Sequence, residues 1–137
     1  MDDLSRADDR TVRRVVVDHV KIGVGDIERS RTFYRAALAP LGFEELAVSA
    51  DGREVSYGPP GLDDFIVSAN VPAAPGLHVA FATQGREQVD AFHAAALAAG
   101  GTDNGPPGPR AQYSPGYYGA FVLDPDGHNV EAVCHEG

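Results

Sequence analysis

Cysteine and lysine are scarce in this chain, which argues against a disulfide-stabilised protein and against one that binds nucleic acids or anionic membranes. The 137 residues include one cysteine, Cys134, and one lysine, Lys21. A single cysteine cannot form a disulfide within the chain, and its apolar surroundings predict a buried structural thiol. The formal net charge is −9 and the arginines are scattered. Because nucleic acids and anionic membranes bind clustered positive charge, we expect neither as a partner.

Long apolar runs are also missing. No stretch approaches the ~20 apolar residues that a membrane-spanning helix needs. Residues 1–14 mix Asp and Arg without an apolar core, and they are expected to form a disordered leader rather than a signal peptide or a membrane span. Without an export signal, the cytoplasm is the expected location. Residues 15–135 have the length of a single domain with its own core.

A gapless internal repeat at an offset of 59 residues divides this domain. The matched positions are His19 and His78, Phe33 and Phe92, Leu38 and Leu97, and Gly42 and Gly101. Such self-similarity indicates a duplicated architecture, so we expect a first module at 15–70 and a second at 76–135. The repeat also pairs two histidines, which are potential metal ligands.

Both modules are predicted to have the order β-α-β-β-β. Patterning in the first module predicts a strand at 15–24, a helix at 27–38 and strands at 43–49, 54–58 and 64–70. Patterning in the second predicts a strand at 77–83, a helix at 86–99, a Gly- and Pro-rich loop at 103–115, and strands at 117–123 and 128–135. Alternation along the first strand places His19 and Lys21 on the face opposite Val20 and Ile22.

The opening residues 17–20 (Val-Asp-His-Val) and the closing residues 121–131 (FVLDPDGHNVE) carry a family resemblance. With this order of elements, the chain resembles the vicinal oxygen chelate superfamily, which includes glyoxalase I, extradiol dioxygenases, fosfomycin-resistance thiol transferases and bleomycin-resistance proteins. The resemblance implies an α+β fold of two tandem modules that form a curved mixed-sheet half-barrel around a metal site. It also implies the metal ligands His19, His78 and Glu131.

Glyoxalase I has a fourth ligand, an acid in the first module. Aligning the turns at 60–61 and 126–127 matches Glu131 with Phe65, which predicts a site with three protein ligands. Asp63 or Asp64 could replace the missing acid only after a shift of the strand register.

Two imidazoles and one carboxylate can hold Fe, Mn, Zn, Ni or Co while leaving coordination positions open. The resemblance therefore implies a metal-dependent lyase, isomerase or dioxygenase that acts on a small oxygen-chelating substrate, with Glu131 in the catalytic site. The alternative is a metal-free binding protein of the bleomycin-resistance type, in which His and Glu form only a hydrogen-bond network. An acidic chain of that type would suit a cationic ligand.

Four further side chains are candidates for substrate binding: Tyr113, Tyr117, Arg110 and Lys21. Tyr118 is the predicted proton donor. The alternative for the tyrosines is packing at a cavity rim, and for Lys21 it is a position in solvent. His128, in the last turn, is expected at the surface.

A half-barrel leaves sheet edges to be covered, so we expect a homodimer. His19 would then meet His78 and Glu131 either within one chain or across the dimer.

Overall fold

The computed structural model describes residues 16–74 and 76–135, so the leader predicted at 1–14 lies outside the described residues. The first module contains β1 (Val20–Gly23), α1 (Ile27–Leu38), the 3-10 helix η1 (Ala39–Leu41), β2 (Glu44–Val48), β3 (Glu54–Gly58) and β4 (Phe65–Ser68). The second contains β5 (His78–Ala82), α2 (Arg86–Ala98), β6 (Thr102–Pro109), β7 (Tyr117–Leu123) and β8 (Asn129–His135). The order β-α-β-β-β occurs twice, as the sequence repeat predicts.

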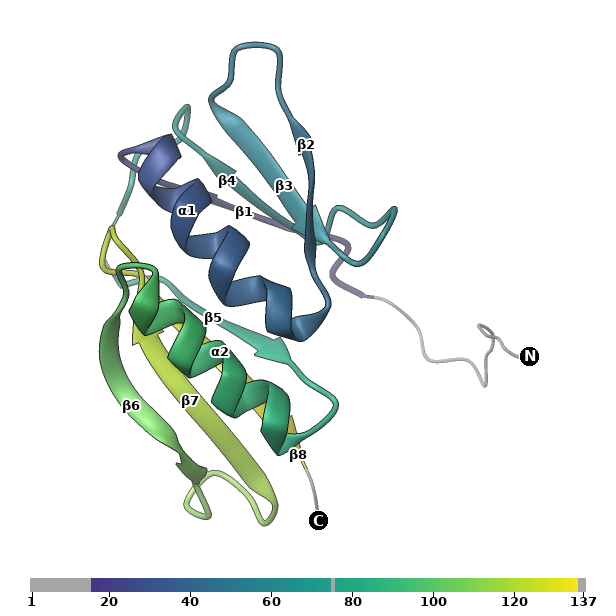
Figure 1. The fold of residues 1–137 in the computed structure, drawn as a ribbon, viewed down its shortest axis with the longest axis vertical. Coiled ribbons are helices and arrows are strands. Elements are labelled where there is room, and N and C mark those ends of the chain that lie inside the picture. The colour runs from purple at the N-terminus through teal and green to yellow at the C-terminus, as the bar shows by residue number, and fades with distance from the viewer. Residues whose placement is uncertain (1–15, 75, 136–137) are drawn as a thin grey trace, which may run out of the picture.

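Each module forms its own open, four-stranded mixed sheet (Figure 1). The strand orders are β1-β4-β3-β2 and β5-β8-β7-β6. In both sheets the first strand runs parallel to the last, and the other neighbours are antiparallel. The predicted α+β fold with two tandem modules is confirmed.

Two predicted segments differ from the structure. The first strand spans only Val20–Gly23, so His19 lies just before β1 rather than within a long strand. The loop predicted at 103–115 is wrong in its first half, because Thr102–Pro109 forms β6. This strand lies at the edge of its sheet and pairs with β7 through two register shifts. An edge strand tolerates proline, because the missing N–H group can face solvent.

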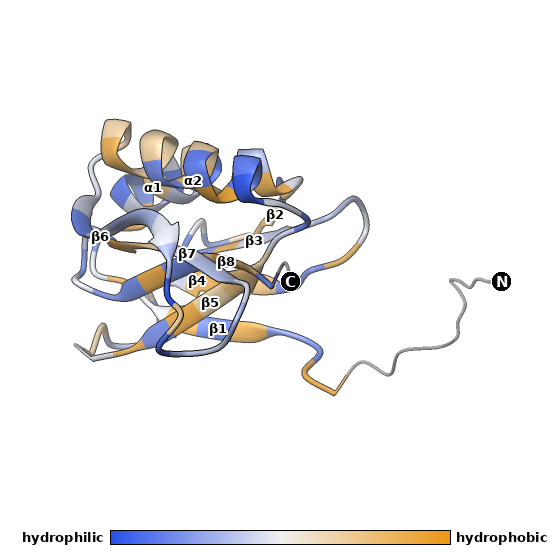
Figure 2. Cartoon of the chain, turned by 90° about the horizontal axis from the view of Figure 1, so that it is seen from below, coloured by the Kyte–Doolittle hydropathy of each residue, from blue (hydrophilic) through white to orange (hydrophobic). Residues whose placement is uncertain are grey.

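The core lies between the sheets and the two helices, which share one layer and pack against each other (Figure 2). The repeat equivalents Phe33 and Phe92 are both fully buried, whereas Leu38 is buried and its equivalent Leu97 is exposed. Cys134 is buried, as predicted. Neither helix of the described chain is long and apolar enough to cross a membrane.

The turn between β7 and β8 ties the second module to the first. The Tyr34 hydroxyl donates to Oδ2 of Asp124 at 2.5 Å, and the Gly25 N–H donates to Oδ1 of Asp126 at 2.9 Å. Nε2 of His128 lies 2.8 Å from the carbonyl oxygen of Gly23. His128 is therefore buried between the modules, which corrects its predicted surface position.

Candidate functional site

His78 and Glu131 come together on the face of the second sheet opposite α2. His78 is the first residue of β5, and Glu131 lies on the neighbouring strand β8, where it pairs with Ala80. Nε2 of His78 lies 3.1 Å from Oε1 of Glu131. The Glu131 side chain is only 2% exposed, whereas that of His78 is 47% exposed. A buried carboxylate therefore meets an imidazole that ligands can reach.

The second hydrogen bond of His78 determines what its Nε2 atom can bind. Nδ1 lies 3.1 Å from the carbonyl oxygen of Asn129, and a carbonyl can only accept, so Nδ1 carries the hydrogen. In the neutral ring, Nε2 then directs a lone pair at the Glu131 carboxylate. Two electron-rich atoms at this distance need a proton or a metal ion between them. Metal-binding histidines commonly have their other ring nitrogen fixed by a backbone carbonyl in this way, so the pair fits a divalent cation.

Tyr117 completes the surroundings of the carboxylate. Its hydroxyl donates to Oε2 of Glu131, while burial, followed by this hydrogen bond and the charge of Glu131, raises the pKa of Tyr117. The phenol therefore stays protonated and acts as a donor at neutral pH. A cavity of about 400 Å³ is lined by His78, Tyr113, Tyr117, Phe121 and Glu131. The predicted candidates Tyr113 and Tyr117 thus share this cavity with the His–Glu pair.

His19 lies in a different place. It lines a second cavity, of about 640 Å³, together with Asp64, Phe65 and residues 79–82, and its Nδ1 atom is 2.8 Å from Oδ1 of Asp18. The start of β1 is therefore next to the end of β5. At the other end of β1, the carbonyl oxygen of Gly23 contacts His128. His128 directly precedes Asn129, the first residue of β8, and Asn129 pairs with His78 at the start of β5. The end of β1 is therefore near the start of β5. The two strands run in opposite directions along the boundary between the modules, so their histidines lie at opposite ends of it.

The strand register also identifies the counterpart of Glu131. Val20 pairs with Phe65 in the first sheet, and its repeat equivalent Val79 pairs with Val130 in the second. Ile66 is therefore the equivalent of Glu131, which corrects the alignment with Phe65. Between the turn glycine and the equivalent strand positions, the first module has one residue more than the second. Aligning the turns alone therefore shifts the match by one residue. Both counterparts are apolar, and the asymmetry between the modules remains.

The acids considered as a fourth ligand lie apart from Glu131. Asp64 lines the cavity of His19, and Asp63 lines a groove on the face of the first sheet. Burial, together with the charges of Asp18 and Asp63, raises the pKa of Asp64.

Tyr118 does not face Glu131, because neighbouring residues of a strand point to opposite sides. Its hydroxyl donates to Oδ1 of Asp90 at 2.7 Å, and the Arg86 guanidinium lies 4.6 Å from its ring centroid. The hydroxyl is therefore directed at α2. Tyr117 therefore lines the cavity of His78 and Glu131, and Tyr118 does not.

The two cationic candidates also bind neighbouring protein groups. The Arg110 guanidinium donates to the carbonyl oxygens of Pro106 at 2.7 Å and Gly108 at 2.9 Å, which fixes the bend of β6. Nζ of Lys21 lies 3.2 Å from Oε2 of Glu54 on the first sheet. Neither side chain lines the cavity of His78 and Glu131.

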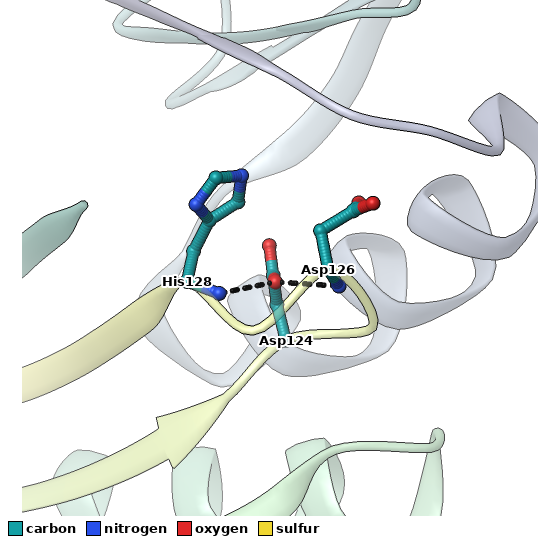
Figure 3. Close-up of side chains that lie close together, drawn as sticks. All are labelled: Asp124, Asp126 and His128. Atoms are coloured by element: carbon teal, nitrogen blue, oxygen red, sulfur yellow. Dashed lines mark hydrogen bonds between the residues drawn. The ribbon is translucent and has the colours of Figure 1, made fainter. Parts of the chain in front are cut away.

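Sequence reasoning missed one cluster of metal-ligating side chains. Among residues 16–74 and 76–135, Asp124, Asp126 and His128 offer ligand atoms that lie within 4.8 Å of one another (Figure 3). However, Oδ1 of Asp124 accepts from the N–H groups of Asp126 and His128, and Oδ2 accepts from Tyr34. Because these bonds occupy the carboxylate, the cluster is better explained as the clamp between the modules. The Asp-Pro-Asp-Gly turn was its signal in the sequence.

Comparisons of the sequence and of the structure with known proteins identify the same family. Residues 16–132 match the family described as the Glyoxalase/Bleomycin resistance protein/Dioxygenase superfamily. A glyoxalase/bleomycin resistance protein from Albidiferax ferrireducens T118 is 36% identical, with a TM-score of 0.75 over 85% of this chain and 97% of that one. A glyoxalase/dioxygenase from Nostoc punctiforme shares the fold at 21% identity, with a TM-score of 0.65 over 92% and 99% of the two chains. No curated protein matches the sequence.

Proposed function

The chain belongs to the Glyoxalase/Bleomycin resistance protein/Dioxygenase superfamily, and from this membership we propose that it is a divalent-metal-dependent enzyme acting on a small oxygen-chelating substrate. The observation that carries the proposal is the contact of Nε2 of His78 with the buried carboxylate of Glu131 at 3.1 Å. With Nδ1 bonded to a carbonyl, this pair is arranged as two ligands of one cation.

The third ligand in the proposal is His19 from a second copy of the chain. Within one chain His19 and His78 line separate cavities at opposite ends of the boundary between the modules. Around His19, the side chains of Val17 and Leu62 are 67% and 57% exposed, and they line a cavity with an aromatic floor of Phe43, Phe65 and Phe81. Contact with a second copy would bury this apolar surface. A homodimer would then contain two equivalent sites.

A divalent ion held by these residues would bind the substrate through its oxygens and neutralise the negative charge that develops on them. The chain's own residues have separate parts in the proposed site. His78, Glu131 and His19 of the second copy would hold the ion, and the rings of Tyr113 and Phe121, which line the cavity, would contact the substrate. Arg110 and Lys21 are engaged with protein groups, so the proposal assigns them no contact with substrate.

Elemental analysis of protein purified without chelator tests this proposal. We expect about one ion per wild-type chain, and little metal in His19→Ala and His78→Ala. His93→Ala is the matched control, because His93 lines neither of the two cavities and its Nε2 atom lies 2.9 Å from Oδ1 of Asp103. A wild-type chain that neither contains nor takes up a divalent metal contradicts the proposal.

Mixing the two deficient variants tests the shared site. In a mixed dimer, the His19→Ala chain contributes His78 and Glu131, and the His78→Ala chain contributes His19. After random exchange we expect about a quarter of the wild-type metal content, because half of the dimers are mixed and each has one intact site of two. A site built within one chain would give no recovery.

The alternative function is metal-free binding of a cationic ligand. It is favoured by the net charge of −9 and by the same 3.1 Å contact, which also suits a protonated imidazole bonded to a carboxylate. Two results together would support this alternative: the wild type takes up no metal, and it binds a cationic drug equally well with and without EDTA.

A further inference from the structure

We propose that Tyr117 is a positioning residue for the cation site, whose hydroxyl holds Oε2 of Glu131 and leaves Oε1 as the single carboxylate ligand beside His78. This inference rests on the proposed function, because it concerns how the cation is held. It identifies a residue outside the predicted set of ligands that controls the geometry of that set.

The position of Tyr117 on β7 makes the contact unusual. Phe121 lies directly opposite Glu131 in the β7–β8 ladder, whereas Tyr117 lies opposite His135. Tyr117 and Phe121 point to the same side of the sheet, so the Tyr117 ring must lean along the strand to reach Glu131. Between them on this side lies Gly119, which has no side chain to block the ring.

Gly119 provides the space for this contact. A Cβ atom at this position would lie 3.1 Å from Oε2 of Glu131 and 3.2 Å from Cε1 of Tyr117. Both distances are tighter than ordinary van der Waals contact, so a side chain here would push the phenol and the carboxylate apart. Gly119→Ala thus perturbs the same contact as Tyr117→Phe without removing the hydroxyl.

The ring of Tyr117 is held on both sides. Tyr113 packs against it with a centroid distance of 5.0 Å, and His135 packs against it at 5.1 Å with an interplanar angle of 87°. Tyr117→Phe preserves these ring contacts and removes only the donor to Oε2. In the variant the buried carboxylate can rotate or bind a cation through both oxygens. Loss of such an outer hydrogen bond typically weakens metal affinity about 10- to 100-fold.

The test is a titration of the full chain with Co²⁺, followed by calorimetry and by visible absorption, which reports the coordination of the ion. We expect Tyr117→Phe to bind Co²⁺ about 10- to 100-fold more weakly than wild type and with a changed spectrum. Gly119→Ala should change affinity and spectrum in the same direction. Tyr118→Phe is the matched control, because its hydroxyl bonds to Asp90 on the other side of β7, and it should resemble wild type.

The outcomes separate the two proposals. Wild-type affinity and spectrum in both Tyr117→Phe and Gly119→Ala would overturn the positioning role while leaving the metal site intact. A wild type that binds no Co²⁺, or a His78→Ala variant that binds it normally, would overturn the proposed function and this inference with it. Thermal unfolding of each variant identifies any that does not fold. Since Gly119→Ala retains every hydrogen-bonding group, it still tests the inference if Tyr117→Phe is unstable.

Discussion

The hydrogen bond between Tyr34 and Asp124 joins the two modules, and its contribution to the free energy of unfolding can be measured. Tyr34 lies on α1 of the first module and is fully buried, whereas Asp124 directly follows β7 in the second and is 4% exposed. The Tyr34 hydroxyl oxygen lies 2.5 Å from Oδ2 of Asp124. Tyr34→Phe removes the donor but retains the ring, which packs 4.8 Å from Phe33 and 5.0 Å from Phe65 between centroids. The perturbation is therefore limited to one hydroxyl.

We expect Tyr34→Phe to lower the free energy of unfolding by about 2 kcal/mol. A hydrogen bond to a charged group contributes about 1.5–3 kcal/mol, and its loss leaves a buried carboxylate oxygen without its partner. In a domain of this size, the corresponding drop in Tm is about 6 °C. Tyr118→Phe is the control, because it removes a 2.7 Å hydrogen bond to Asp90 at the exposed surface, which should contribute at most about 1 kcal/mol.

Urea unfolding at several pH values provides the assay. Burial, followed by the charge of Asp124, raises the pKa of Tyr34 well above its ordinary value. A raised pKa in the folded state gives stability that is complete below the pKa of the unfolded chain, about 10 for tyrosine. This stability is lost as the pH rises further, so wild type and Tyr34→Phe should converge above pH ~10. A Tyr34→Phe loss no greater than that of Tyr118→Phe at pH 7 would refute the reasoning.

Two further predictions concern stability. Glu45→Gln should lower the free energy of unfolding by about 1 kcal/mol at pH 7, because Arg31 donates to Glu45 at 2.8 Å and this bond lowers the pKa of that carboxylate. In urea unfolding, the difference from wild type should begin to shrink as the pH falls below ~4.5, the pKa in the unfolded chain, and it should disappear once the pH falls below the lowered pKa of the folded state. A difference that does not shrink with falling pH contradicts this origin. Gly58→Ala should prevent stable folding, because its Cβ atom would lie 1.6 Å from the carbonyl oxygen of Leu62. Gly52→Ala is the control: its φ is 72° with open space around it, so it should lower the free energy of unfolding by only about 1–2 kcal/mol. Equal losses of Tm in the two variants would contradict the steric argument.

The fold follows from the sequence where local patterns and the repeat agree. The helix at Ile27–Leu38 and the strands at Glu54–Gly58 and Tyr117–Leu123 have the predicted bounds. β6 was missed because its glycines and prolines are typical of loops, and only pairing with β7 makes Thr102–Pro109 a strand. Tertiary pairing of this kind leaves no periodic signal along the segment itself.

The sequence repeat identifies candidate residues of the site but not how the two modules arrange them. A repeat shows that His19 and His78 have equivalent positions in two modules, and strand parity predicts that Glu131 faces the same side of the sheet as His78, where the two side chains are in contact. Neither signal gives the relative direction of β1 and β5. Because these strands run in opposite directions along the boundary, the equivalent histidines are separated rather than joined. The Tyr118 hydroxyl lies on the other side of β7 from the His78–Glu131 pair for a related reason, since a shift of one residue moves a strand side chain to the other face.

The asymmetry between the modules then determines what a shared site would contain. If each His19 met a His78–Glu131 pair of the second copy, the position equivalent to Glu131 in the first module would be taken by Ile66, as the strand register requires. An apolar side chain cannot bind the cation, so each proposed site would have three protein ligands and open positions for substrate. In this arrangement one carboxylate carries the whole negative charge of the ligand set. Its orientation then matters more than in a site with two acids, which is why the Tyr117 hydroxyl on Oε2 is the contact to test.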